Sequence, residues 1–282
     1  HLRDRWRARH QNLQAKLWSK HKESLDWLSN NYRQLVAGSL GGLMLLTGHT
    51  STPNINIPQA IASESSEKIV DNKVFLISDL AKVLPPSARP LNADEEQKAL
   101  DILSRTFHIK ITAQLEGKRL NRSYGLIGAE QHLARYPGDT LSTHFDSEEE
   151  SQFYWQSGMA PGLGAWRYFA NSAESLTQLD IDREKYYIAV QTFLSKDFNT
   201  RFAEYRDFYK YRKMLVVNPN NGKAIIADIA DAGPGESTGK HLGGSPEVMH
   251  YLERFDGRQR GPVLYFFVDD PNDKIPLGPV QI

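Results

Sequence analysis

The stretch from residue 214 to residue 252 constrains the fold more than any other part of the chain. It opens with the apolar run Met214 to Val217, passes through Asn221-Gly222, and continues as a second β-branched run over residues 223–230. Asn and Gly accept the positive φ of a hairpin turn, and β-branched residues favour strands. The pattern therefore predicts two antiparallel strands joined by a turn.

A turn, a glycine-rich loop and a short helix are predicted to follow this hairpin. The turn is indicated by Asp231, Gly233 and Pro234, because Gly and Pro interrupt a strand. Ser245 and Pro246 then stand at the first positions of an apolar helical pattern that reaches residue 252. Ser is a good N-cap and Pro suits the first helical position, so the helix is expected to begin here.

This order of elements resembles the double-psi β-barrel of rare-lipoprotein-A-like and expansin-like proteins of the bacterial cell envelope. The resemblance is confined to residues 214–252 and is carried by Val217, Asn218, Asn221, Gly222, Lys223, Ile229, Asp231, Gly233, Pro234, Gly239, Lys240 and Ser245. It implies a six-stranded barrel over residues 183–282. In that barrel Asn221, Gly222, Gly233, Pro234 and Ser245 are expected to be structural turn residues.

The same resemblance implies a catalytic Asp231, acting as a general acid toward a glycosidic oxygen. The expected substrate-binding residues are Lys240, His241, Tyr209 and Tyr211. A lytic transglycosylase can work with one acid/base group, because a sugar hydroxyl replaces water as the nucleophile. The alternative is structural: the Asp231 carboxylate bonds the backbone of its own turn.

Two departures from the family pattern leave the enzyme assignment open. The family carries an Asp shortly before the helix, whereas this chain has Leu242-Gly243-Gly244. The family also places a His shortly before the hairpin, and no His stands there in this chain. Three functions therefore stay in play: a lytic transglycosylase acting on peptidoglycan, a non-catalytic glycan-binding module, and a structural or protein-interaction domain of the envelope.

The N-terminal quarter of the sequence predicts export or membrane association. Residues 1–33 read as a basic amphipathic helix, residues 34–48 as a short apolar signal or anchor segment, and residues 49–72 as a polar linker. A basic region before an apolar run is typical of a signal sequence, although this run is shorter than the roughly 20 residues of a membrane span. The predicted location is the cell envelope, outside the cytoplasmic membrane; the alternative is a buried helix.

Residues 73–182 are predicted to form a mixed region of helices and strands. A helix over residues 74–83 should end at the following prolines, and a second should start at Asn92, whose next residues include three acids. A strand is expected over residues 109–115, and a strand running into a helix over residues 124–132. The predicted fold class is thus α+β, with an N-terminal helix and candidate anchor, a mixed middle region and a C-terminal double-psi-like β-barrel.

Composition excludes several classes of function. The formal net charge is +0, so no overall field attracts nucleic acid. Cysteine is absent, which excludes disulfides, thiol nucleophiles and thiolate-bound metals. Two close-set groups, Glu130-Gln131-His132 and His144-Phe145-Asp146, lack the H-E-x-x-H spacing of a zinc helix. The sequence therefore predicts no metal site and no cofactor.

Overall fold

A computed structural model describes residues 60–254 and 261–282, and residues 59–282 form one compact unit. The predicted basic helix, the apolar segment and the first part of the predicted linker lie outside the described residues. Within the described ranges, no helix is both long enough and apolar enough to cross a bilayer.

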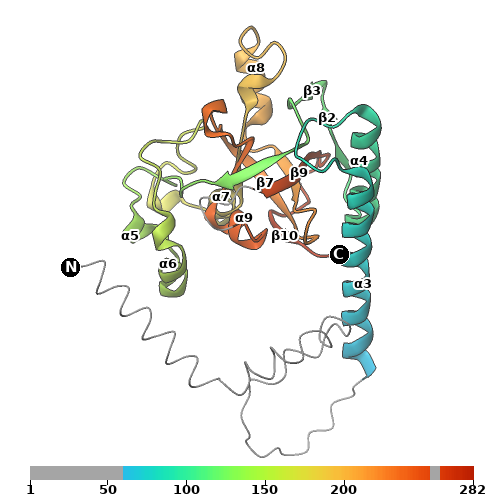
Figure 1. The fold of residues 1–282 in the computed structure, drawn as a ribbon. Helices are drawn as coiled ribbons and strands as arrows, with labels where there is room; N and C mark the ends of the chain where they lie inside the picture. The colour runs from blue at the N-terminus through green and yellow to red at the C-terminus, as the bar shows by residue number, and fades with distance from the viewer. Residues whose placement is uncertain (1–59, 255–260) are drawn as a thin grey trace, which may run out of the picture. The chain divides into compact units, whose positions relative to one another are not determined.

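Six strands close into a mixed β-barrel at the centre of this unit (Figure 1). Around the ring, β4 pairs with β8, β8 with β5, β5 with β7, β7 with β6, β6 with β9, and β9 with β4. The pairs β4–β8 and β5–β7 are parallel and the other four are antiparallel. The strands are β4 (Tyr124–Ala129), β5 (Tyr187–Val190), β6 (Lys213–Val217), β7 (Ala224–Ala232), β8 (Leu242–Gly244) and β9 (Gly261–Val268).

The predicted hairpin and the six-stranded barrel are confirmed. Strands β6 and β7 are antiparallel, with Val217 opposite Ala224. The ring, however, is closed by β4, which comes from the stretch predicted as a separate middle region. Strand β10 (Gly278–Val280) lies outside the ring on β7, and β1 (Ile111–Thr112) lies outside it on β9. Strands β2 (Gln114–Leu115) and β3 (Lys118–Arg119) form a separate small hairpin.

From Met214 to Val217, strand β6 is apolar because both of its faces are buried there. Met214 and Val216 point into the barrel interior, where they pack in one hydrophobic cluster. Leu215 and Val217 belong to a second cluster on the outer face, under helices α3 (Ala60–Val83) and α4 (Ala93–Phe107). Alternation of side chains along a strand assigns successive residues to the two cores, which explains the lack of polar positions.

Helices α3 and α4 lie side by side along one flank of the barrel (Figure 1). The predicted start of α4 is confirmed: the Asn92 side chain accepts from the Glu95 N–H, and Glu95 bonds back to the Asn92 N–H. Helix α3 begins at Ala60, inside the stretch predicted as a linker. Its early residues include Ala, Glu and Lys, which favour helix despite the interspersed serines.

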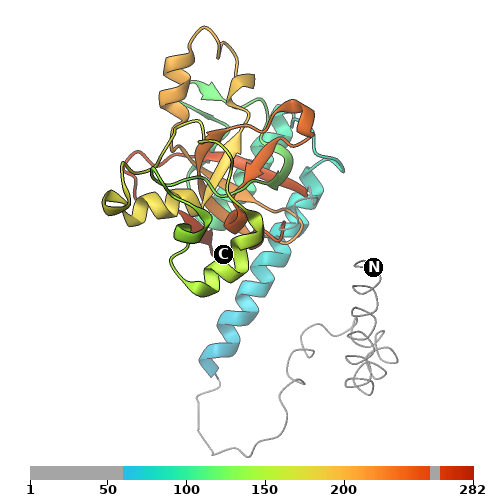
Figure 2. The same ribbon diagram turned by 90° about the vertical axis from the view of Figure 1, so that its left-hand side faces the viewer.

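The remaining helices cover the other sides of the barrel (Figure 2). After β4 the chain does not enter the predicted helix; His132 instead forms a β-bridge with Met159. The short helices are α5 (Leu141–His144), α6 (Glu148–Tyr154), η1 (Trp155–Ser157), η2 (Ala173–Ser175), α7 (Gln178–Lys185), η3 (Thr192–Leu194), α8 (Phe202–Tyr209), η4 (Glu236–Thr238) and α9 (Pro246–Tyr251).

Candidate functional site

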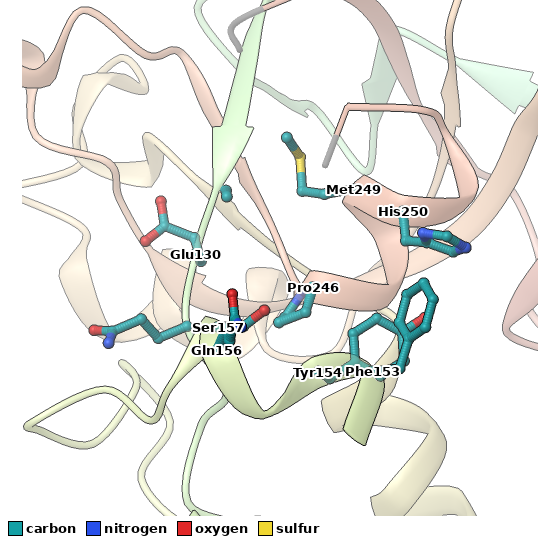
Figure 3. Close-up of a pocket in the computed structure, with 10 residues that line it drawn as sticks. Glu130, Phe153, Tyr154, Gln156, Ser157, Pro246, Met249 and His250 are labelled. Carbon is teal, nitrogen blue, oxygen red and sulfur yellow. The ribbon is translucent and has the colours of Figure 1, made fainter. Parts of the chain in front are cut away.

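A pocket of about 490 Å³ lies where the carboxyl end of β4 meets α6, η1 and α9 (Figure 3). Strands β4 and β8 are parallel neighbours, with Ala129 opposite Gly244, so they end at the same edge of the barrel. The chain continues from β8 directly into α9, and this puts the start of α9 beside the end of β4. The pocket is lined by Ala129, Glu130, Gln131, Phe153, Tyr154, Gln156, Ser157, Pro246, Met249 and His250.

Aromatic rings form one side of the pocket, and Figure 3 shows Glu130 on the other side. Phe153 is 59% exposed, and its ring contacts those of Tyr154 and His250 edge-on, with centroid distances of 4.8 Å and 4.6 Å. Trp155, at the start of η1, is 47% exposed. Large exposed aromatic side chains beside a pocket are typical of a ligand-binding surface.

An ion pair stands at the opposite side of the pocket. Lys240 Nζ lies 2.7 Å from Glu130 Oε1 and donates to the Ala129 carbonyl at 2.9 Å. Both side chains need glycine beneath them: a Cβ on Gly128 would lie 2.3 Å from Lys240 Cδ, and one on Gly243 would lie 2.3 Å from Glu130 Oε1. Lys240, predicted as a substrate-binding residue, therefore adjoins the pocket through Glu130.

Asp231 lies at the end of β7, beside the loop that precedes η2. Both hydrogen bonds that it accepts within residues 60–254 and 261–282 end on Oδ1, from the N–H of Ala165 at 2.7 Å and of Ala232 at 2.8 Å. Burial raises the pKa of Asp231, and the two hydrogen bonds oppose that rise. The carboxylate thus bonds the backbone N–H of its own turn at Ala232 and that of a distant loop at Ala165, and neither bond uses Oδ2.

The other predicted substrate-binding residues occupy different surroundings. His241 is fixed to β4, because its Nδ1 accepts from the Leu126 N–H at 3.0 Å, and burial lowers its pKa. Tyr211 lines a second cavity of about 420 Å³ and has the Arg183 guanidinium 4.3 Å from its ring centroid. Tyr209 is 0% exposed and its hydroxyl contacts Ser195 Oγ at 2.6 Å, so its ring belongs to the core and presents no surface to a substrate.

The predicted turn residues lie at the two ends of β7 and at the start of α9. Gly222 has φ of +70° and donates to the Asn218 carbonyl, while Asn221 accepts from the Lys223 N–H. Gly233 and Pro234 are joined by a cis peptide bond at the end of β7. Ser245 caps α9, accepting from the Val248 N–H at 3.1 Å.

Buried beside the aromatic side of the pocket is a group of ionisable side chains that the sequence did not bring together. His132, His144 and Glu184 are 0%, 3% and 1% exposed at their side chains, and one ligating atom from each lies within 4.8 Å of the others. His132 follows β4, His144 ends α5, and Glu184 lies on α7. The His132 ring is 6.2 Å from the Tyr154 ring, which lines the pocket.

Hydrogen bonds between the histidines and the carboxylates determine which of these side chains are charged. His144 Nε2 lies 3.0 Å from Glu184 Oε2, and its Nδ1 lies 2.9 Å from Asp139 Oδ2. Burial alone would lower the pKa of His144, but the two carboxylates raise it to about 9. Burial would likewise raise the pKa of Glu184, and the two histidines lower it instead. The His144 imidazolium is thus held between two carboxylates.

Comparisons with protein-family models, with curated proteins and with solved structures found no match. The sequence pointed to the groups around His132 and His144, but not to Glu184 as their partner. The only local signal was an acidic residue three positions before a strand, which is too common to identify a site.

Proposed function

We propose that this protein binds a glycan of the bacterial cell envelope, peptidoglycan or a related polymer, in the pocket between β4, α6 and α9. The observation that carries the proposal is the exposed ring of Phe153 beside a pocket lined by acid, amide and hydroxyl groups. Aromatic rings pack against the apolar faces of sugars, while carboxylates and amides bond their hydroxyls. The pocket volume falls in the range of roughly 300–1,000 Å³ that suits small-molecule sites.

The barrel supports kinship with the rare-lipoprotein-A-like and expansin-like families. The closed ring, the β6–β7 hairpin and the Ser245-capped α9 agree with the order of elements in a double-psi barrel. The proposed location, outside the cytoplasmic membrane with association through residues 34–48, rests on the basic and then apolar start of the sequence.

A second candidate function is glycan cleavage, with Asp231 as the acid. Two observations favour it. Burial raises the Asp231 pKa, and the bonds from Ala165 and Ala232 both end on Oδ1 and not on Oδ2. A carboxyl group that keeps its proton to higher pH is a better general acid. The reaction that needs one such group is a lytic transglycosylase reaction, in which a sugar hydroxyl of the substrate displaces the leaving group.

Incubation of the purified full chain with insoluble peptidoglycan separates these functions. Pelleting of the protein without product supports a binding module, and release of anhydro-sugars supports an enzyme. A chain that neither pellets nor releases sugars overturns the glycan proposal and favours a protein-interaction domain.

The variant that tests the pocket is Phe153→Ala, with Phe202→Ala as its matched control. Both side chains are more than half exposed, so neither change should disturb the core. Phe202 begins α8, which lies far from α6 in Figures 1 and 2. We expect Phe153→Ala to weaken glycan binding about tenfold, which corresponds to about 1.4 kcal/mol for a central aromatic contact. Equal affinities of the two variants would contradict the assignment of the pocket.

A further inference from the structure

We propose that His132, His144 and Glu184 form a binding site for one divalent transition-metal ion, best suited to Zn²⁺, that fastens the loops between β4 and β5 to the barrel. Two imidazoles and one carboxylate are a common ligand set for this ion. Cysteine is absent from the chain, so a thiolate-bound site is excluded. The three side chains lie within the described part of the fold, apart from the glycan pocket lining.

The nitrogen atoms of the His132 ring are buried and could be satisfied by a metal ion. It is 0% exposed, yet neither Nδ1 nor Nε2 has a hydrogen-bond partner among the described residues. Nδ1 lies 3.4 Å from Glu184 Oε1, within ion-pair distance but without hydrogen-bond geometry. Buried polar groups are nearly always satisfied, so a fully buried imidazole with two unpartnered nitrogens calls for a partner. A metal ion bound to Nδ1 supplies one.

His144 is oriented as a ligating histidine would be. Its Nε2 faces Glu184, so a bound ion would take the place of the proton on that nitrogen, and its Nδ1 is bonded to Asp139, whose side chain is 0% exposed. A carboxylate on the far nitrogen of a ligating histidine is the usual support in zinc sites, because it fixes the ring orientation and raises its basicity. Asp139 is also held by the Arg135 N–H at 2.8 Å, so this positioning residue is itself anchored.

The spacing of the three side chains is close to that of a metal site. Zn²⁺ bonds of roughly 2.0–2.2 Å at tetrahedral angles place neighbouring ligand atoms about 3.3–3.6 Å apart. His144 Nε2 lies 3.0 Å from Glu184 Oε2, and His132 Nδ1 lies 3.4 Å from Oε1 of the same carboxylate. One ligating atom from each of the three residues lies within 4.8 Å of the other two. Small side-chain adjustments therefore suffice to coordinate an ion.

The burial of all three ligands assigns the ion a structural role. Structural zinc sites usually have four protein ligands, whereas catalytic sites have three and keep one open position. The three ligands here leave a fourth position, but their side chains are at most 3% exposed, so an ion between them would be shielded from solvent. The ligands come from the segment after β4, from α5 and from α7. One ion would therefore link three segments that all lie between β4 and β5. We therefore expect the ion to stabilise the folded chain, since binding free energy adds to folding free energy.

The test uses the purified full chain, stripped with a chelator and then titrated with Zn²⁺. The expected results are one tightly bound Zn²⁺ per chain by elemental analysis, and a melting temperature that rises with Zn²⁺ and falls again with chelator. Co²⁺ in place of Zn²⁺ should give the intense visible absorption of a tetrahedral site. An unchanged melting temperature together with no such absorption in the wild type overturns the proposal without any variant.

Variants can identify which of the nine histidines of the chain bind the ion. The change His132→Asn should abolish the tight site, while His108→Asn, at an exposed position with φ of +55° that Asn tolerates, should bind Zn²⁺ as the wild type does. Asp139→Asn should keep the stoichiometry and weaken affinity roughly 10–100-fold, as expected for a residue that acts through a ligand. Wild-type Zn²⁺ affinity in a folded His132→Asn chain would refute the site.

Discussion

The replacement of Asp231 by Ala and by Asn tests whether this carboxylate is structural or catalytic. Oδ1 accepts from two backbone N–H groups, Ala165 at 2.7 Å and Ala232 at 2.8 Å. One of these donors lies 66 positions away along the chain, so the carboxylate ties the loop before η2 to the end of β7. The Ala variant removes both bonds, whereas the Asn variant keeps a carbonyl oxygen that can accept them.

The expected cost of Asp231→Ala follows from these two bonds. A hydrogen bond to a charged group contributes roughly 1.5–3 kcal/mol, so two of them set an upper range of about 3–6 kcal/mol. Ala165 and Ala232 are exposed, and water can replace part of what is lost. Removal of the half-buried charge of Asp231 offsets a further part of the lost stability. We therefore expect a loss of about 1–3 kcal/mol, or roughly 2–12 °C in melting temperature for a domain of this size.

The stability of the Asp231→Asn variant relative to wild type should change with pH, and the direction of that change can be checked separately. The folded-state pKa of Asp231 is raised above its unfolded value, so its contribution to stability is full below the unfolded pKa, about 3.9. That contribution is lost as pH rises through the folded pKa. Urea unfolding at several pH values should therefore show the Asn variant gaining stability relative to wild type between pH 4 and pH 7.

The two roles predict different combinations of stability and activity. A structural Asp231 gives a destabilised Ala variant, a stable Asn variant, and glycan binding by both in the folded fraction. A catalytic Asp231 gives a folded Asn variant that releases no anhydro-sugars from peptidoglycan while the wild type does. An Ala variant within about 0.5 kcal/mol of wild type would refute the reasoning about the two backbone bonds, since surface substitutions cost no more than that.

Two further changes test the packing of the barrel. Leu215→Ala, at 0% exposure between the barrel and the helices on its flank, should cost about 2–5 kcal/mol by urea unfolding, whereas Leu179→Ala, 45% exposed, should cost less than about 0.5 kcal/mol; equal costs would contradict the second core. Ser245→Ala removes the cap on the Val248 N–H and the bond to the Lys185 carbonyl, and should cost about 2–3 kcal/mol, with a loss below about 0.5 kcal/mol arguing against a capping role.

The sequence by itself determined the elements whose signals are local. The β6–β7 hairpin follows from apolar runs on either side of Asn221-Gly222, and α9 follows from Ser245-Pro246. The start of α4 at Asn92 is equally local, because a capping box acts within four residues. Each of these features depends on backbone dihedrals and hydrogen bonds between near neighbours in the chain, so residue types at short spacings were enough to predict them.

The tertiary structure alone decided which segments close the barrel and which side chains meet. Strand β4 pairs in parallel with β8, with Ile127 opposite Leu242, and nothing near either strand specifies that partner or its register. The same pairing places the end of β4 beside α9 and so creates the pocket around Phe153. His132 and Glu184 are likewise brought together across intervening loops, since their approach is set by packing between distant segments and not by spacing along the chain.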